Sequence, residues 1–436
     1  MRKIIFAALM SLLLAACESI FGDDEEILPG ERIPVMLLDR ALEPDPRIAD
    51  LPVRLPPPLT NTDWPQAGGN PTHAMHHLAA GEELRQAWRV SIGEGSSDDQ
   101  RLLAAPVIGD GRIFAMDADA EVSAFSTETG ARIWRVETVP EDEEEGELGG
   151  GLAYHNGWLF VTTGSAQVIA LDAGTGDEIW RQGVPGPVRA APTVSDGRVF
   201  AVTVDNQLQT LDAEDGAILW SHAGIAEIAG LLGGASPAVD GGIVIVPYSS
   251  GELFALRVEN GRFVWSDTLA AIRRVDAVSA LADIRGHPVM DRGRVFAVSH
   301  SGRMVAIDLR TGVRAWEQRI GGTQTPWVAG DFLYVLTTEG QLVCLSWSDG
   351  RIRWVLPLQR FEDEEEQEDP IIWTGPVLAG DRLIVAGSHS EVLSISPYTG
   401  TIMGWLKTSE AVLIPPVVAG NTIYLLTEDA DLIALR

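Results

Sequence analysis

The stretch ALDAGTGDEIW (170–180) decides the fold, because versions of it recur along the chain. Each version has a small residue, an apolar residue, a short turn that ends in Gly, and a Trp. The other versions are AFSTETGARIW (124–134), TLDAEDGAILW (210–220), ALRVENGRFVW (255–265), AIDLRTGVRAW (306–316), CLSWSDGRIRW (344–354) and SISPYTGTIMGW (394–405). Counted from Trp88, the Trp-to-Trp steps are 46, 46, 40, 45, 51, 38 and 51 residues. Repeats of this length are typical of the four-stranded blades of a propeller.

The residues before each Trp motif indicate strands. Runs such as DGRVFAVT (196–203) and GDFLYVLT (330–337) are apolar, β-branched and bounded by turn residues. The Gly that lies four residues before most of the Trp residues supplies the positive φ that a hairpin turn commonly requires. In the copy that ends at Trp405 the spacing is five, with Gly404 before the Trp, and we expect a bulge there. We expect each Trp to pack between neighbouring blades.

The two ends of the repeat region complete one another. LRQAWRVSI (84–92) supplies a Trp strand with no strands before it, and NTIYLLTEDADLIALR (421–436) supplies strands that stop before any Trp. The first strand should therefore join the last blade and leave the ring without an open edge. The sequence predicts an all-β protein in which residues 63–436 form an eight-bladed β-propeller of four-stranded antiparallel blades.

Charge excludes some classes of partner. The formal net charge of the 436-residue chain is −30, without a basic cluster, which argues against nucleic acid and against an anionic lipid surface. Acidic residues concentrate in EDEEEGE (141–147) and EDEEEQED (362–369). Runs of this kind are usually solvated loops that keep a protein soluble, and a cation site or a basic partner is the alternative.

The N-terminus predicts export and a lipid anchor. Arg2 and Lys3 precede a short apolar run, which is typical of a signal peptide, here residues 1–16. The phrase LAAC (14–17) resembles the bacterial lipobox, which implies that Cys17 is acylated and that the protein lies on the periplasmic face of the outer membrane. Residues 17–62 are acidic and Pro-rich, which predicts an extended tether, part of it along the ring.

Other residues that attract a chemical interpretation have simpler explanations. His73, His76 and His77 have the spacing of metal ligands, but no Cys or acidic residue lies nearby in the sequence, and a loop role is favoured over a metal site. Cys344 occupies the position of small residues in other repeats, so we expect it to be buried. A recurring Asp starts several turns, where a hydrogen bond to the backbone is favoured over calcium binding: Asp172, Asp212 and Asp308.

Three features together are similar to the BamB family of outer-membrane assembly lipoproteins: the lipobox, the opening DWPQAGGNPTH (63–73) and the eightfold repeat. The resemblance covers the chain from Cys17 to Arg436. It implies a non-enzymatic scaffold without cofactors in the outer membrane β-barrel assembly (BAM) complex. Such a scaffold binds the periplasmic POTRA region of BamA and helps outer membrane proteins to fold and insert. Unfolded outer membrane proteins are a second expected partner.

Quinoprotein dehydrogenases, which depend on pyrroloquinoline quinone (PQQ), share the repeat and a similar opening, and they are the alternative. Resemblance to them would imply adjacent cysteines near the cofactor, whereas this chain has only Cys17 and Cys344. A haem-attachment motif and a nucleophile elbow are also absent from the sequence. The residues therefore favour the scaffold over the enzyme.

The resemblance also implies which loops bind the partner. RQGVPGPVRAAP (181–192) matches the contact loop of the family, with Val188 and Arg189 at its apolar and arginine positions. In LADIRGHP (281–288), Asp283 matches one acidic contact position and Arg285 occupies the other, so the contact differs in detail from the family pattern. A salt bridge between loops of adjacent blades is the alternative role for these residues.

Overall fold

Each repeat folds into one twisted sheet, and the strands of that sheet differ in how far their side chains are buried. The computed structural model describes residues 42–139, 148–227, 229–270 and 281–436. In the repeat around Trp180, strands β7 (Trp158–Thr162) and β8 (Gln167–Asp172) are buried over most of their length, because neighbouring sheets cover both faces. The outermost strand, β9 (Glu178–Gly183), alternates between exposed and half-buried side chains, as expected for a strand with one solvated face.

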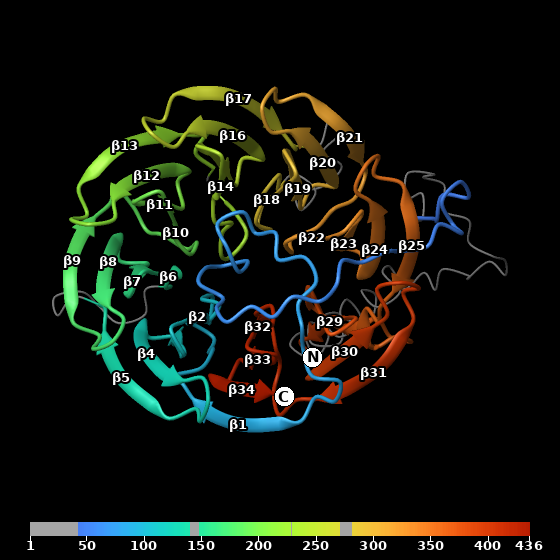
Figure 1. Cartoon of the computed structure of the whole chain (residues 1–436), viewed down its shortest axis with the longest axis horizontal. Helices are drawn as coiled ribbons and strands as arrows, with labels where there is room; N and C mark the ends of the chain where they lie inside the picture. The colour runs from blue at the N-terminus through green and yellow to red at the C-terminus, as the bar shows by residue number, and fades with distance from the viewer. Residues whose placement is uncertain (1–41, 140–147, 228, 271–280) are drawn as a thin grey trace, which may run out of the picture. The chain divides into compact units, whose positions relative to one another are not determined.

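Eight such sheets form a closed ring, which confirms the predicted fold (Figure 1). From the innermost to the outermost strand, the blades are β2 (Val107–Gly109), β3 (Arg112–Met116), β4 (Glu121–Ser126) and β5 (Arg132–Glu137); β6 (Gly151–His155), β7, β8 and β9; β10 (Thr193–Ser195), β11 (Arg198–Val202), β12 (Gln207–Asp212) and β13 (Ile218–Ala223); β14 (Ala238–Asp240), β15 (Ile243–Pro247), β16 (Glu252–Arg257) and β17 (Phe263–Thr268); β18 (Val289–Asp291), β19 (Arg294–Ser299), β20 (Arg303–Asp308) and β21 (Arg314–Gln318); β22 (Trp327–Ala329), β23 (Phe332–Leu336), β24 (Gln341–Ser346) and β25 (Ile352–Pro357); β28 (Trp373–Ala379), β29 (Arg382–Gly387), β30 (Glu391–Ile395) and β31 (Ile402–Lys407); and β32 (Val417–Ala419), β33 (Thr422–Leu426), β34 (Asp431–Leu435) and β1 (Gln86–Ser91).

A short hairpin lies outside the blades. It consists of β26 (Phe361–Asp363) and β27 (Glu368–Pro370) and carries the acidic run 362–369, which is exposed throughout. The other acidic run, 141–147, and the predicted signal peptide with Cys17 lie outside the described residues. Within the described part of the chain there is no helix long and apolar enough to cross a membrane.

The last blade takes its outermost strand from the N-terminal part of the chain. Strand β1 pairs antiparallel with β34, and Trp88 lies opposite Ala434. Backbone hydrogen bonds in both directions between Arg85 and Arg436, each 2.9 Å long, extend this pairing beyond the strands. The ladder thus joins the start of the repeat region to its end.

A second closure runs through the centre of the ring, where residues 61–80 hydrogen-bond to every blade (Figure 1). Trp64 exchanges backbone hydrogen bonds of 2.9 and 2.8 Å with Ile108 of β2, and Leu78 accepts one of 2.9 Å from Gly380. The remaining partners follow in blade order: Tyr154 to Pro65, Val194 to Gln66, Val239 to Pro71, Met290 to Thr72, the Trp327 indole to His76, and Gly420 to Asn61. The segment therefore links all eight blades.

Residues 43–62 also pack against the ring, so this part of the predicted tether lies along it. The Asp45 amide donates to the Ile352 carbonyl of β25 at 2.8 Å. Arg353 donates to the Leu51 carbonyl at 2.7 Å, and Val53 is 8% exposed. The Ile352 carbonyl of the outermost strand β25 thereby gains a hydrogen-bond donor that would otherwise have to come from solvent.

Seven Trp residues lock neighbouring blades together, as the repeat predicts. Each indole lies over the turn Gly of the next blade, and a Cβ added to Gly216 would come within 2.7 Å of the Trp180 ring. Each indole Nε1 also donates to a backbone carbonyl of that turn, at 2.7–3.2 Å. The seven pairs are Trp88 and Thr127, Trp134 and Ala173, Trp180 and Ala213, Trp220 and Val258, Trp265 and Leu309, Trp316 and Trp347, and Trp354 and Pro397.

Trp405 does not follow this rule, and the prediction that it packs between blades is wrong. Gly404 takes the register position of the other Trp residues, opposite Ser394, while Trp405 lies one residue further on, opposite Leu393. Its side chain is consequently 66% exposed. The irregularity in this pairing is the one found in the equivalent strand pairs of the other blades, so no additional bulge forms. The next blade closes between β34 and β1 and has no turn Gly on which an indole could stack.

The contrast between Trp180 and Trp405 can be tested by unfolding. Trp180→Ala removes an indole that contacts Gly216 and donates to Ala213, so it should lower the free energy of unfolding by about 3 kcal/mol. Trp405→Ala, the matched control, should change it by about 0.5 kcal/mol or less because the side chain is exposed. Urea denaturation measures both. Equal losses in the two variants would contradict the assigned lock.

Candidate functional site

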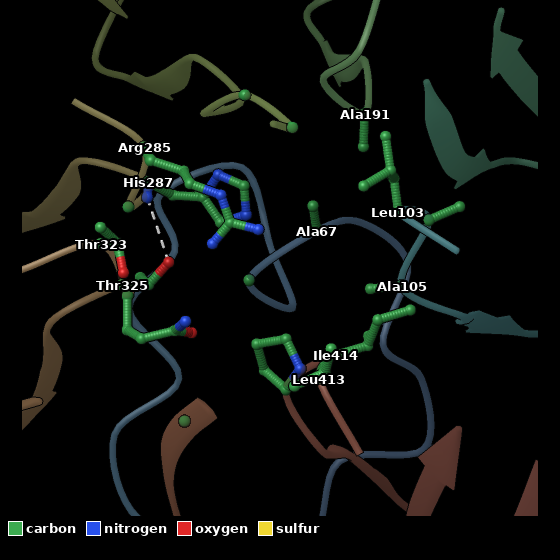
Figure 2. A pocket seen from close by; sticks show the side chains of 18 of the residues that line it. Ala67, Leu103, Ala105, Ala191, Arg285, His287, Thr323, Thr325, Leu413 and Ile414 are labelled. Atoms are coloured by element: carbon green, nitrogen blue, oxygen red, sulfur yellow. Dashed lines mark hydrogen bonds between the residues drawn. The ribbon is translucent and has the colours of Figure 1, made fainter. Parts of the chain in front are cut away.

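The connections between consecutive blades all lie on one face of the ring. Strands alternate in direction within a blade, so the connections from one outermost strand to the next innermost strand share a face. The turns that hold the stacked Gly residues lie on the opposite face. At the centre of the first face is a cavity of about 590 Å³, to which every inter-blade connection contributes (Figure 2). Residues of the central segment also line it: Trp64, Ala67, Gly68 and His73.

Three neighbouring connections, 184–192, 224–237 and 281–288, are held together at this cavity. Ser236 donates its hydroxyl to the Ala191 carbonyl at 2.8 Å and its amide to Nδ1 of His287 at 2.8 Å. Arg285 Nε donates to the Leu232 carbonyl at 2.7 Å. The four residues implied as partner contacts therefore belong to two loops that are joined through the connection between them, 224–237.

Those four residues do not all face the cavity. Val188 is fully buried and its amide donates to the Thr163 carbonyl at 3.1 Å, so it supports the loop and offers no apolar surface to a partner. Asp283 is 5% exposed, and its Oδ2 accepts the Leu231 amide at 2.8 Å. Burial raises the pKa of this carboxyl. Arg189 and Arg285, in contrast, line the cavity.

The alternative role, a salt bridge between adjacent loops, is not formed by these groups. Within the described ranges, no ion pair of 4.0 Å or less joins Asp283 to Arg189 or Arg285. Asp283 instead acts as a backbone acceptor, which fixes the position of the 231–234 stretch beside Arg285. Of the four residues that the sequence predicts as contacts, Arg189 and Arg285 therefore line the cavity, whereas Val188 and Asp283 are buried supports of their loops.

The charged residues that line the cavity are Arg101, Arg189, Arg285 and Glu428. The excess of arginine contrasts with the formal net charge of −30. Glu428 is partly buried, and its burial raises the pKa of the carboxyl. Sequence reasoning missed Arg101, in the connection before β2, and Glu428, between β33 and β34. The repeat gives no signal for Arg101, because aligning RLLAAP (101–106) with PVRAAP (187–192) places Leu103 opposite Arg189.

The three histidines of the central segment serve different contacts. His73 Nδ1 lies 2.7 Å from the Pro288 carbonyl, and His77 Nδ1 lies 2.8 Å from the Pro56 carbonyl. His76 Nε2 is 3.6 Å from Asp291. Because a carbonyl only accepts, Nδ1 of His73 and of His77 must carry the proton. In the described part of the chain, no group of three or more His, Cys, Asp or Glu side chains could hold a metal ion.

The repeated Asp residues and Cys344 have the predicted structural roles. Oδ1 of Asp172, of Asp212 and of Asp308 each accepts a backbone amide in its own turn at 2.8 Å. Cys344 is fully buried opposite Trp354, and burial raises the pKa of its thiol. These residues stabilise turns and fill the core.

The sequence matches the family described as the outer membrane protein assembly factor BamB over residues 81–145, 118–356 and 361–436. The chain belongs to this family. The outer membrane protein assembly factor BamB of Yersinia pestis is 28% identical over 348 residues, which cover 78% of this chain and 86% of that protein. The crystal structure of BamB from Moraxella catarrhalis has a TM-score of 0.69 at 21% identity and covers 81% of this chain and 100% of that one.

The same fold occurs in enzymes. A europium-containing methanol dehydrogenase has a TM-score of 0.68 at 14% identity, over 84% of this chain and 89% of that chain. At this identity the likeness concerns the fold alone. The chain neighbours of Cys344 are Val343 and Leu345, so it is not part of the adjacent pair of cysteines that resemblance to quinoprotein dehydrogenases would imply.

Burial of His73 predicts a pH dependence of stability. Desolvation lowers the pKa of His73 from 6.5 to about 4 in the folded protein. The unfolded chain therefore takes up a proton near pH 6.5 that the folded protein takes up only near pH 4. The stabilisation is complete above pH 6.5 and is lost as the pH falls through this window, by about 3 kcal/mol.

The test compares His73→Asn with His76→Asn by urea denaturation between pH 7 and pH 4. Both positions have positive φ, 60° and 54°, which Asn tolerates, but the His76 side chain is 41% exposed. His73→Asn should flatten the fall in unfolding free energy between pH 6.5 and pH 4, whereas His76→Asn should retain it. Identical pH profiles for the wild type and His73→Asn would show that His73 titrates normally.

Proposed function

We propose that this chain is a non-enzymatic accessory lipoprotein of the outer membrane β-barrel assembly complex. In this role it is anchored through Cys17 to the periplasmic face of the outer membrane and binds the periplasmic POTRA region of BamA. It thereby assists the folding and insertion of outer membrane proteins. Membership of the BamB family over most of the repeat region carries the proposal.

The geometry of the inter-blade loops supports a partner site at the mouth of the cavity. Arg189 and Arg285 line this cavity from loops that Ser236 ties together, so the two guanidinium groups sit on a pre-organised surface. Leu232 and Ile372 also line the cavity and are 39% and 57% exposed. Arginine beside accessible apolar side chains is a common composition of binding hot spots. Val188 and Asp283, which are buried, support the loops that carry this surface.

Substitution of Arg189 tests the partner site. Arg189→Ala removes a cavity-lining cation but no core contact, so it should reduce co-purification of BamA from solubilised membranes by about tenfold or more. Its melting temperature should stay within a few degrees of the wild type. Arg262→Ala is the matched control, because Arg262 is exposed in a turn on the opposite face. The interface lies elsewhere if Arg189→Ala co-purifies BamA as the wild type does.

The alternative, a quinoprotein dehydrogenase, is tested by cofactor binding. The likeness to methanol dehydrogenase motivates the experiment, and the absence of adjacent cysteines from the sequence predicts its outcome. Purified protein offered PQQ and calcium should retain no stoichiometric quinone absorbance after gel filtration, and it should reduce no dye with alcohols or sugars. Quinone retention together with dye reduction would overturn the scaffold proposal.

A further inference from the structure

The cavity at the centre of the inter-blade face has an electrostatic character opposite to that of the chain. Three arginines and one glutamate are its charged lining residues, in a chain with a formal net charge of −30. An arginine confined in a partly enclosed cavity loses hydration, and a carboxylate that arrives there restores the lost interactions. Charge complementarity therefore favours an anionic occupant.

Hydrogen-bond donors line one wall of this cavity. Nε of Arg285 donates a hydrogen bond to the Leu232 carbonyl. The two terminal nitrogens of Arg285 are therefore the donors that remain for an occupant of the cavity. His287 accepts the Ser236 amide at Nδ1, and its ring is neutral because burial lowers its pKa well below 6.5, so the proton must reside on Nε2. Gln324 accepts the Thr374 hydroxyl at Oε1, which leaves its NH₂ group as a donor. An acceptor-rich group matches this wall.

The opposite wall is apolar. Figure 2 shows Arg285, His287 and Thr325 on one side of the cavity, and Leu103, Ala191 and Ile414 facing them across it. Leu232, whose carbonyl accepts a hydrogen bond from Arg285, and Ile372 add partly exposed apolar side chains to the lining. A small hydrophilic anion would leave this wall uncovered. A peptide segment with an acidic residue next to apolar side chains would fill both halves.

We propose that the central cavity binds a short extended segment of a partner protein through an Asp or Glu side chain flanked by apolar residues, with Arg285 as the principal carboxylate ligand and Arg189 as the second. The inference deepens the proposed partner site by naming the chemistry of the segment that enters it. The identity of the partner rests on the proposed function, whereas the preference for a carboxylate does not depend on it.

Calorimetric titration of the full chain with two blocked peptides tests the preference for a carboxylate. The probes are acetyl-Leu-Asp-Leu-amide and acetyl-Leu-Asn-Leu-amide, which differ only in the acidic group. The wild type should bind the Asp peptide about tenfold or more tightly than the Asn peptide, the factor expected for a charge-assisted hydrogen bond. Arg285→Gln should abolish this discrimination, and Arg285→Lys should retain part of it, because the charge stays while the planar fork is lost.

Further variants keep the test independent of folding defects. Arg189→Gln should reduce the discrimination, and Arg262→Gln on the opposite face should leave it unchanged. If Arg285→Gln fails to fold, Arg189→Gln decides alone. The proposal is overturned if no peptide binds at 10 mM, if the two peptides bind equally, or if discrimination survives in every folded cavity variant. It is also overturned if succinate binds as tightly as the Asp peptide, because the cavity would then be a site for small anions.

Parallel capture of BamA separates this inference from the proposed function. Discrimination between the peptides without capture of BamA would support the cavity chemistry and contradict the proposed partner. Capture of BamA by the wild type and equally by Arg285→Gln, without peptide discrimination, would support the partner and overturn the cavity chemistry. Loss of both properties in Arg285→Gln, with an unchanged melting temperature, is the result expected when both are correct.

Discussion

The hydrogen bonds between residues 61–80 and the innermost strands of all eight blades are the constraint on which the rest of the structure depends. Most of these strands are only three residues long, so a blade has little ladder with which to hold its inner end. The central segment supplies the missing hydrogen-bond partners. The side-chain amide of Gln66, for example, donates to the Val194 carbonyl and accepts from the Val194 amide. Because buried backbone groups are costly to leave unpaired, one continuous segment fixes eight inner edges together. The same segment lines the cavity, so the fold and the site share one constraint.

The Trp locks provide the complementary constraint at the outer edge. An indole stacked on a Gly and bonded to the neighbouring turn fixes each blade relative to the next, and Gly is required because a Cβ would collide with the ring. The exception at Gly404 follows from the closure. A blade assembled from both ends of the repeat region has a strand pair, β34 and β1, where the others have a covalent turn, so there is no surface on which the eighth indole could stack. Trp405 then lies exposed on the adjacent register position.

The sequence was sufficient for the features that repeat and insufficient for those that occur once. The strand period recurs in every blade, and the turn Gly and Trp recur in most of them, so the blade number and the joining of residues 84–92 to the last blade could be predicted. At Trp405 the sequence predicts a bulge and not a one-residue displacement, because the spacing from Gly to Trp does not reveal which residue keeps the register. Burial of Val188 and Asp283 could not be predicted either, since it depends on how three loops from different blades pack around Ser236. The place of Arg101 in the cavity could not be predicted, because Arg101 does not share the repeat position of Arg189.

The cavity shows why a fold shared with enzymes does not decide the chemistry of this chain. A propeller brings one connection from every blade to the same central mouth, and whatever those eight connections carry becomes the site. Here they carry arginines, donors fixed by backbone contacts, and an apolar wall. Arg285 is held at Nε by the Leu232 carbonyl, whose loop is fixed in turn by the buried Asp283. Because Arg285 is already held in this way, it would lose less conformational entropy on binding an occupant, which is the advantage of a pre-organised site. In the proposed site, the buried acidic residue acts indirectly, by fixing the loop that holds the arginine at the cavity.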